Sequence, residues 1–289
     1  MSLHIFGSII TGCGCAANNR GETEGNITTL QKILWNGQVH TTVSSEAIRW
    51  ALRYFWQCKG IEVNRVWNDD KDDHEWRDSS WAGWQKGHSY IDDDLLGYMV
   101  AEGAKVEGEK GSTLKRRGVL EIARAISLNP YAGDISFNAK SGVKGRTSLY
   151  GTEIHATRYQ YGFALTPQRL KIPARCLDAL DALVGISEVA GNHSRFLFDF
   201  SPESVVFRIS DDPAPRILYC FEEADRDVNT AALVQKVIAG DIPASELYVG
   251  GRISSNKELQ ELGLRNCWQG VRKAVNGLKA EIKARLGLE

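Results

Sequence analysis

The N-terminal part of the chain alternates between strand-like runs and one amphipathic helix. Residues 3–11 are rich in β-branched and aromatic side chains, which predicts a strand. A hairpin signal, Asn36-Gly37, is followed by a second expected strand at 38–43. Either Ser44 or Ser45 is a suitable N-cap for the helix that comes next. The apolar stripe of that helix, at helical spacing, consists of Ala47, Ile48, Ala51, Leu52 and Phe55.

The second half of the chain predicts a further set of strands and helices. Strands are expected at 152–166, 196–200, 205–209, 217–221 and 247–249. Helices are expected at 174–183, 231–238 and 258–283. The order of strand, helix, insertion, strands, helix and strand predicts an α+β fold on a mainly antiparallel sheet. An RRM-like (ferredoxin-like) core fits this order.

Residues 60–118 differ in character from both flanking segments. Acidic runs alternate there with tryptophans and glycines, which indicates a large, irregular insertion. We interpret Asp92-Asp93-Asp94 as the solvated start of a short helix at 91–101, because acidic residues are favoured at a helix N-terminus. A loop is expected at 105–111. Lys115-Arg116-Arg117 is the sharpest basic cluster in the chain.

Composition and charge narrow the class of protein. The 289 residues are 43% hydrophobic and 25% charged, enough for one large core or a core with sizeable insertions. A run of about 18 apolar residues is missing, and the N-terminus does not read as a signal peptide, so the cytoplasm is expected. The net charge of −1 argues against a freely acting, non-specific nucleic-acid binder but is compatible with a cationic groove.

The motifs of common enzyme classes are absent from the sequence. The chain has no G-x-S-x-G elbow, no phosphate-binding loop and no complete dinucleotide fingerprint. Cys13 and Cys15 form one C-x-C without a second pair, and His74 and His88 match no compact ligand spacing. We therefore predict no catalytic residues, no metal site and no cofactor. The run Asn192-His193-Ser194-Arg195 could supply an acid–base histidine, but a loop that touches phosphates is preferred because no partner acid or nucleophile stands out.

The helix that begins at Ser44-Ser45 is the most useful candidate site. A helix N-terminus presents free N–H groups and a positive dipole end, which together bind phosphate. Arg49 and Arg53 are one turn apart, so both are expected to be exposed and to point toward one groove.

The segments considered together resemble the DevR family, the Cas-seven-type Cascade backbone subunit of type I-B CRISPR systems, in the RAMP superfamily. The resemblance is nearly full length and keeps the family order. It is carried by residues 36–53, 91–99, 125–128, 154–161, 191–202 and 250–252, which read NGQVHTTVSSEAIRWALR, IDDDLLGYM, AISL, IHATRYQY, GNHSRFLFDFSP and GGR.

The resemblance implies a palm, a finger and a thumb. The RRM-like palm would comprise 1–59 and 151–289, the finger insertion 60–150 and the short thumb about 186–200. Phe196 or Phe198 would displace a base. RNA contacts are expected at Arg20, Asn26, Ser44, Ser45, Arg49, Arg53, Lys115, Arg116, Asn192, His193 and Arg195. Glu46 is left out, because many relatives have glutamine there and a carboxylate facing phosphate is unfavourable unless paired.

The implied function is non-catalytic. Copies of the subunit would polymerise along a CRISPR RNA and present it for pairing with target DNA in antiviral defence. The expected partners are the guide RNA, target DNA by way of the guide, further copies of the chain and other Cascade subunits, with no membrane. Two alternatives remain open: a metal-dependent RNase of the same superfamily, and a transcriptional or developmental regulator.

Overall fold

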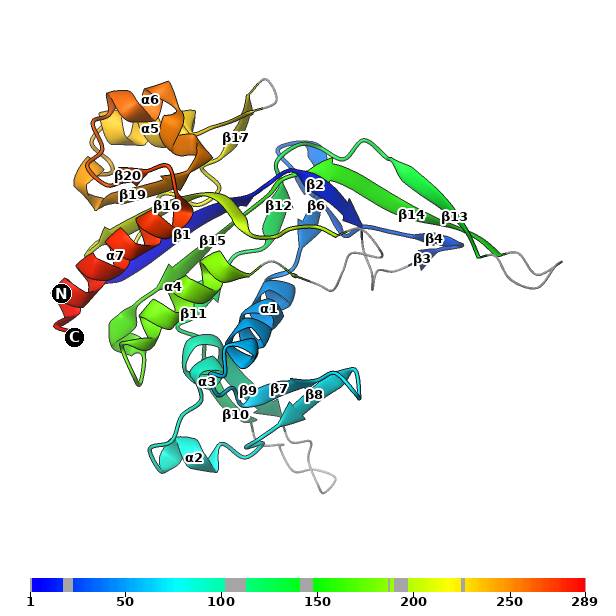
Figure 1. Ribbon diagram of the computed structural model, residues 1–289, viewed down its shortest axis with the longest axis horizontal. Coiled ribbons are helices and arrows are strands. Elements are labelled where there is room, and N and C mark those ends of the chain that lie inside the picture. The colour runs from blue at the N-terminus through cyan, green and yellow to red at the C-terminus, as the bar shows by residue number, and fades with distance from the viewer. Residues whose placement is uncertain are drawn as a thin grey trace.

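The computed structural model has an α+β fold built around one large, mainly antiparallel sheet (Figure 1). It describes residues 2–17, 23–101, 113–140, 148–186, 188–189, 197–224 and 227–288. The strand order of the large sheet is β20-β19-β16-β1-β15-β12-β6-β5, and β11 also pairs with β15. Its strands are β1 (His4–Thr11), β5 (Lys32–Trp35), β6 (Gln38–Val43), β11 (Leu120–Ile122), β12 (Ala125–Ser127), β15 (Tyr159–Leu165), β16 (Pro202–Ser210), β19 (Leu247–Gly251) and β20 (Cys267–Trp268).

Three helices cover one face of the large sheet. They are α1 (Ser45–Cys58), α4 (Arg175–Gly185) and α7 (Val271–Leu286). Successive side chains of a strand point to opposite faces, so Ile5, Ile9 and Phe163 enter the core beneath these helices. Gly7 is required in the middle of β1, because a Cβ there would lie 2.1 Å from a ring carbon of Phe163.

The second face of the sheet is also covered. Phe6, Ile10 and Val206 pack there against the smaller helices and the 3-10 turns between them. These elements are α5 (Ala231–Ile238), α6 (Lys257–Glu261), η3 (Ala244–Glu246), η4 (Arg252–Ser255) and the hairpin of β17 (Glu222–Ala224) and β18 (Asp227–Asn229). Residues 213–221 complete the cover: Phe221 exchanges two hydrogen bonds with the Gln160 amide on β15.

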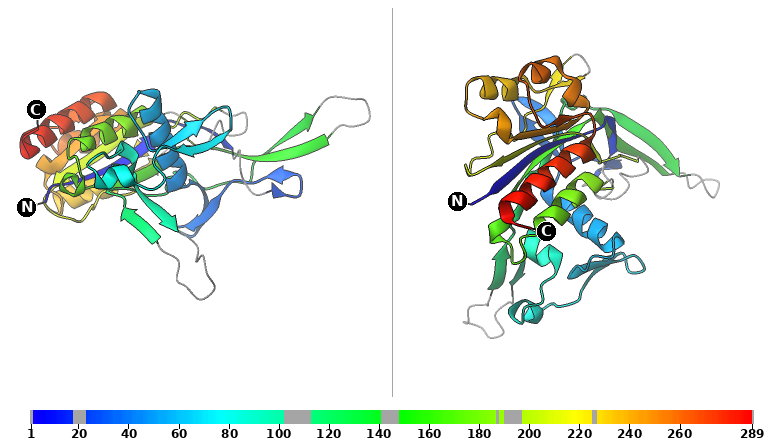
Figure 2. Two further views of the ribbon diagram at one scale, coloured as in Figure 1. Left: turned by 90° about the horizontal axis from the view of Figure 1, so that it is seen from below. Right: turned by 60° about the vertical axis from the view of Figure 1, so that its left-hand side comes forward.

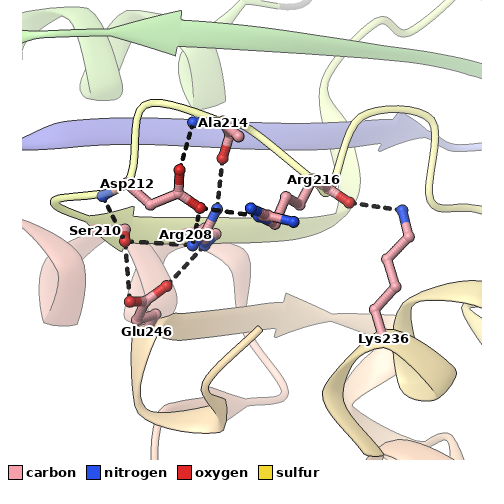
Figure 3. Close-up of polar contacts among 7 residues, drawn as sticks. All are labelled: Arg208, Ser210, Asp212, Ala214, Arg216, Lys236 and Glu246. Carbon is pink, nitrogen blue, oxygen red and sulfur yellow. Dashed lines mark hydrogen bonds and ion pairs between the residues drawn. The ribbon is translucent and has the colours of Figure 1, made fainter. Parts of the chain in front are cut away.

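A buried arginine ties this covering segment to the sheet (Figure 3). The Arg208 side chain is 2% exposed and donates to Glu246 at 2.7 Å and to Asp212 at 3.1 Å. It also donates to the carbonyl of Ala214. Asp212 in turn accepts from Arg216 at 2.8 Å, and its pKa is held well below the usual range, first by the Ala214 N–H and then by the two guanidinium groups. A network of charged side chains therefore connects the C-terminal end of β16 to the segment that follows it.

The insertion between α1 and β11 forms a separate lobe at one end of the sheet (Figure 1). Its elements are the hairpins β7 (Arg65–Asn68)–β8 (Asp73–Trp76) and β9 (Gly97–Ala101)–β10 (Thr113–Arg117), with α2 (Ala82–Gln85), α3 (Ile91–Leu96) and, beside it, η1 (Pro167–Arg169). The rings of Trp81 and Tyr98 stack at 4.4 Å within it. Because β11 and β12 return to the large sheet, the stretch 60–150 divides into this inserted lobe, two sheet strands and a projecting arm.

The arm projects from the other end of the sheet (Figure 2). It contains β2 (Gly14–Ala17), β3 (Thr23–Glu24), β4 (Ile27–Thr28), β13 (Ile135–Lys140) and β14 (Ser148–Thr157). Ile135, Phe137 and Leu149 lie on the same face of the β13–β14 ladder, and Phe137 is 80% exposed. Further large apolar side chains are exposed on the neighbouring β5–β6 hairpin, at Ile33, Leu34 and Val39. Hydrophobic residues thus gather on a part of the molecule with little core of its own.

Buried polar residues connect the arm to the body. The Thr41 hydroxyl lies 2.8 Å from His155 Nδ1 and 2.9 Å from the Tyr159 hydroxyl. The other ring nitrogen of His155 lies 3.1 Å from the Asn129 amide nitrogen. Burial is the main cause that lowers the pKa of His155. These four residues form the arm-base cluster.

Several expected elements are confirmed and others are wrong. The strands at 3–11 and 38–43 and the helix at 174–183 are found within one or two residues of their expected ends, and α1 contains the expected apolar stripe from Ala47 to Phe55. The expected strand at 217–221 is wrong, since Tyr219 has a left-handed φ of 53° that strands do not adopt. Residues 197–200 of the strand expected at 196–200 are likewise not strand. The helix expected at 258–283 is two helices separated by β20, and the one expected at 91–101 ends before Gly97, whose φ is +69°.

The helices of the described part of the chain include none that is both long and apolar enough to cross a membrane.

Candidate nucleic-acid interface

The start of α1 is a capped helix N-terminus at the surface. Of the two serines that the sequence offered, Ser44 is the N-cap, and it accepts a hydrogen bond from the Ala47 N–H at 3.2 Å. The Glu46 carboxylate also sits at this end. Its pKa is lowered, first by its own backbone N–H and also by Ser45, Ser44 and Arg124. A carboxylate of the chain therefore occupies part of the position at which a phosphate could accept these N–H groups.

Arg124 is a cation at this site that sequence reasoning missed. Its side chain is exposed and donates to Thr42 at 3.2 Å and to Gln31 at 3.4 Å. It precedes β12, which pairs with β6 immediately before α1. No local pattern marks this residue, because only the pairing of two strands distant in sequence places it near Glu46.

Arg49 and Arg53 are not the pair of exposed cations that the sequence predicted. Arg53 has a side chain that is 13% exposed and forms an ion pair with Asp92 at 3.4 Å. Arg49 is half-buried and donates to the carbonyl of Leu96 at the end of α3. Both side chains therefore fasten α1 to the inserted lobe, and their contact with RNA stays a prediction.

The interpretation of Asp92-Asp93-Asp94 as a solvated helix start is wrong. All three residues are buried, and each carboxylate accepts hydrogen bonds from donors inside the protein. Asp92 accepts from the backbone N–H groups of Asn64 and Arg65 at 2.7 and 3.1 Å. Asp93 accepts from the Asn64 amide, and its pKa is raised to about 6, mainly by burial and then by the charge of Asp92.

Lys115 and Arg116 have different environments. Lys115 is exposed on β10. Arg116 forms an ion pair with Asp94 at 2.9 Å and lies over the ring of Trp84, 4.6 Å from its centroid. Lys115 and Arg116 thus lie in the inserted lobe, apart from the expected contacts at the α1 start.

The remaining sequence-predicted contacts lie elsewhere. Asn26 is exposed in the turn between β3 and β4, on the arm, where its carbonyl accepts from the Gly151 N–H at 2.9 Å. Phe198 cannot act as an exposed wedge as it stands, because it is 2% exposed and packs on Tyr159 with ring centroids 5.4 Å apart. Arg20, Asn192, His193, Arg195 and Phe196, and the loop expected at 105–111, lie outside the described residues.

Among the described residues, no three His, Cys, Asp or Glu side chains come together in a way that could hold a metal ion. His74 is partly buried beside Arg65 and Arg53, and burial, then those charges, lowers its pKa to about 4. His88 is exposed.

Two solved structures share the fold. A chain of a "CRISPR RNA-guided surveillance complex, pre-nicking" superposes with a TM-score of 0.61 at 10% identity, over 96% of this chain and 100% of that one. A chain of a "CRISPR RNA-guided surveillance complex" gives 0.57 at 15% identity, over 98% and 99%. The protein is thus an α+β chain of the fold class found in such complexes.

A close relative then fixes the family. The "CRISPR-associated protein Cas7/Cst2/DevR" of Myxococcus xanthus (strain DK1622) is 56% identical over 266 residues, 88% of each chain. The chain belongs to the Cas7/Cst2/DevR family of CRISPR-associated proteins. No family model matches it.

Proposed function

We propose that the chain is a backbone subunit of a type I-B Cascade complex, in which copies polymerise along a CRISPR RNA and present it to target DNA. The observation that carries the proposal is the 56% identity to a Cas7/Cst2/DevR protein. The fold shared with chains of RNA-guided surveillance complexes supports it. Such a subunit acts in the cytoplasm, and sequence is read by pairing rather than by the protein.

The palm of this proposal is RRM-like. The strand order β16-β1-β15-β12, with α1 and α4 on one face, supports it because a βαββαβ chain of the ferredoxin-like type gives this order. The inserted lobe then corresponds to the finger, and the segment between α4 and β16 to the thumb.

RNA in this proposal runs past the α1 start instead of across the sheet. RRM modules stack bases on an open sheet face. Here Phe221, Leu218 and their neighbours lie on that face: a Cβ at Gly162 would be 2.4 Å from Leu218. The α1 start, with Ser44, Ser45 and Arg124, remains accessible at the surface.

Assembly with further copies and other Cascade subunits is supported by the arm. Large contiguous apolar patches on a protein surface usually mark interaction sites. Ile135, Phe137 and Leu149 share one face of a projecting ladder, which suits a contact with another chain.

We expect Arg124→Glu to release RNA without unfolding the protein. The side chain is exposed, so the fold should survive. Affinity should fall about tenfold or more, because hydrogen bonds to charged groups contribute about 1.5–3 kcal/mol. The measurement is RNA content and particle size after co-expression with a CRISPR array. Lys257→Glu on α6, which reverses one exposed charge far from α1, is the matched control.

The same particles should show a steep salt dependence. Single-stranded RNA affinity falls with a slope of about −0.7 in log K against log salt for each phosphate neutralised. Arg124→Glu should reduce the slope. Affinity that does not change with salt, or RNA content unchanged in Arg124→Glu, contradicts a phosphate-binding α1 start.

The subunit is proposed to be non-catalytic, so purified protein should not cleave RNA with Mg²⁺ or Mn²⁺. Asp92 and Asp94 already accept internal hydrogen bonds and arginine ion pairs, which leaves little capacity to hold a metal ion. Cleavage products are resolved on a denaturing gel. Cleavage that disappears in His193→Ala would favour the alternative function, a metal-dependent RNase, over the non-catalytic subunit.

A further inference from the structure

A cationic hollow lies at the base of the inserted lobe. It has a volume of about 440 Å³ and is lined by Trp84, Tyr98, Lys115, Arg116, Arg117, Val119 and Arg169. Four of these seven residues are cationic. Lys171 adds a fifth positive charge beside it, with its ammonium 4.5 Å from the centre of the Trp84 ring. The chain as a whole has a net charge of −1, so this concentration of positive charge is local.

The hollow is preorganised by one buried carboxylate. Asp94 is 0% exposed and accepts from Arg116 at 2.9 Å and from Arg175 at 3.0 Å. It also accepts the backbone N–H groups of Lys171 and Ile172 at 2.8 and 3.1 Å. The segment after η1 is therefore fixed against β10. Cations held in place before binding lose less conformational freedom when a ligand arrives.

Part of the positive charge has no internal partner in the described part of the chain. Arg116 is paired with Asp94, and Arg117 with Glu121 at 2.5 Å. The exposed side chains of Lys115 and Arg169 have no described carboxylate within ion-pair distance, and the buried Nε of Arg116 has no hydrogen-bond acceptor. A network that served only the fold would not need Lys115 and Arg169 at its open side.

We propose that this hollow binds phosphate groups of a single nucleic-acid strand other than the strand held at the α1 start. The inference rests on the proposed function. Guanidinium groups match the geometry of phosphate oxygens, and a positively charged groove with aromatic side chains suits a single strand without sequence preference. Tyr98 and Trp84 supply the aromatic part of the wall. The second strand is RNA or DNA, since both have the same phosphodiester chemistry.

The variant Lys115→Ala/Arg169→Ala tests the proposal without disturbing the Asp94 network. Neither side chain contacts Asp94, so folding should be retained. The matched control is Lys257→Ala/Arg285→Ala, which removes two positive charges from α6 and α7. In Figure 1 these helices lie away from the inserted lobe.

Binding is measured by fluorescence anisotropy on RNA-filled particles, with labelled strands that cannot pair with the guide. Separate measurements use single-stranded DNA, single-stranded RNA and duplex DNA, and a fourth adds inorganic pyrophosphate as a competitor. We expect the hollow variant to bind a single strand about tenfold more weakly, because each exposed charge contact contributes up to about fivefold. The salt slope should shrink by about 1.4, or about 0.7 for each phosphate that is no longer neutralised. The control should match the unmodified protein.

These four measurements identify the kind of strand and can also overturn the proposal. A loss seen with DNA alone, RNA alone or both supports it and names the source. Single-strand affinity equal to that of the control, a loss seen only with duplex, or a bound strand that pyrophosphate does not displace overturns it. RNA content is read on the same samples: particles without RNA would count against the proposed function, while anisotropy on the chain alone still tests the hollow.

Discussion

Replacing Asp94 by alanine is expected to lower the free energy of unfolding by about 3–5 kcal/mol, the usual cost of breaking a buried ion pair from one side. The carboxylate is the common acceptor for Arg116, Arg175 and two backbone N–H groups. Its loss leaves two guanidinium groups without their partner and two backbone N–H donors without their acceptor. The inserted lobe should then separate from η1 and α4.

Denaturant unfolding followed by circular dichroism measures the Asp94 effect. Asp94→Asn keeps one acceptor oxygen and should fall between the alanine variant and the unmodified protein. Asp70→Ala, at an exposed carboxylate of the same lobe, is the matched control and should change stability by about 0.5 kcal/mol or less. An alanine variant at Asp94 as stable as this control would show that the network contributes nothing to folding.

Arg208→Met is expected to be the second large loss, also of about 3–5 kcal/mol. The methionine fills similar space but leaves Glu246 without its cation and the Ala214 carbonyl without its donor (Figure 3). The segment at 211–221 should loosen from the second face of the sheet. Hydrogen exchange should then rise in that segment more than in β1.

Arg216→Met is the matched control for Arg208, because both arginines donate to Asp212. Arg216 is 43% exposed, and an exposed pair contributes only about 0–1 kcal/mol. Equal losses in the two variants would mean that burial of Arg208 is not what makes its ion pairs important.

The periodic parts of the fold were predictable from the sequence. A β-branched run predicts β1, and the stripe from Ala47 to Phe55 predicts α1, because each reports which side chains face the core. The segment 217–221 has an equally apolar run but no strand. Its Ile217 and Phe221 are buried as single anchors of an irregular segment, and apolar content alone does not distinguish this from strand alternation.

The acidic triplet shows why the candidate site was harder to predict. A solvated acidic helix start and a buried carboxylate network have the same local sequence. They differ in partners such as Arg53, Arg116 and Arg175, which come from three separate elements. The N-cap at Ser44 was predictable because its partner, Ala47, is three residues away. Arg124 was not, because β12 and β6 are paired across the whole inserted lobe.

The arm of β13 and β14 is attached to the body at the arm-base cluster, so a small change of angle there is amplified along the arm. Six residue pairs join the two strands. A strand rises about 3.3 Å per residue, so the far end of this ladder lies about 20 Å from its base. A tilt of about 10° at the base would move that end by about 3.5 Å. Hydrogen bonds weaken steeply when bent, whereas apolar packing is nondirectional. The contacts of His155 with Thr41 and Asn129, together with the pairing of β14 with β2, therefore resist tilting of the arm and help to hold Phe137 in place.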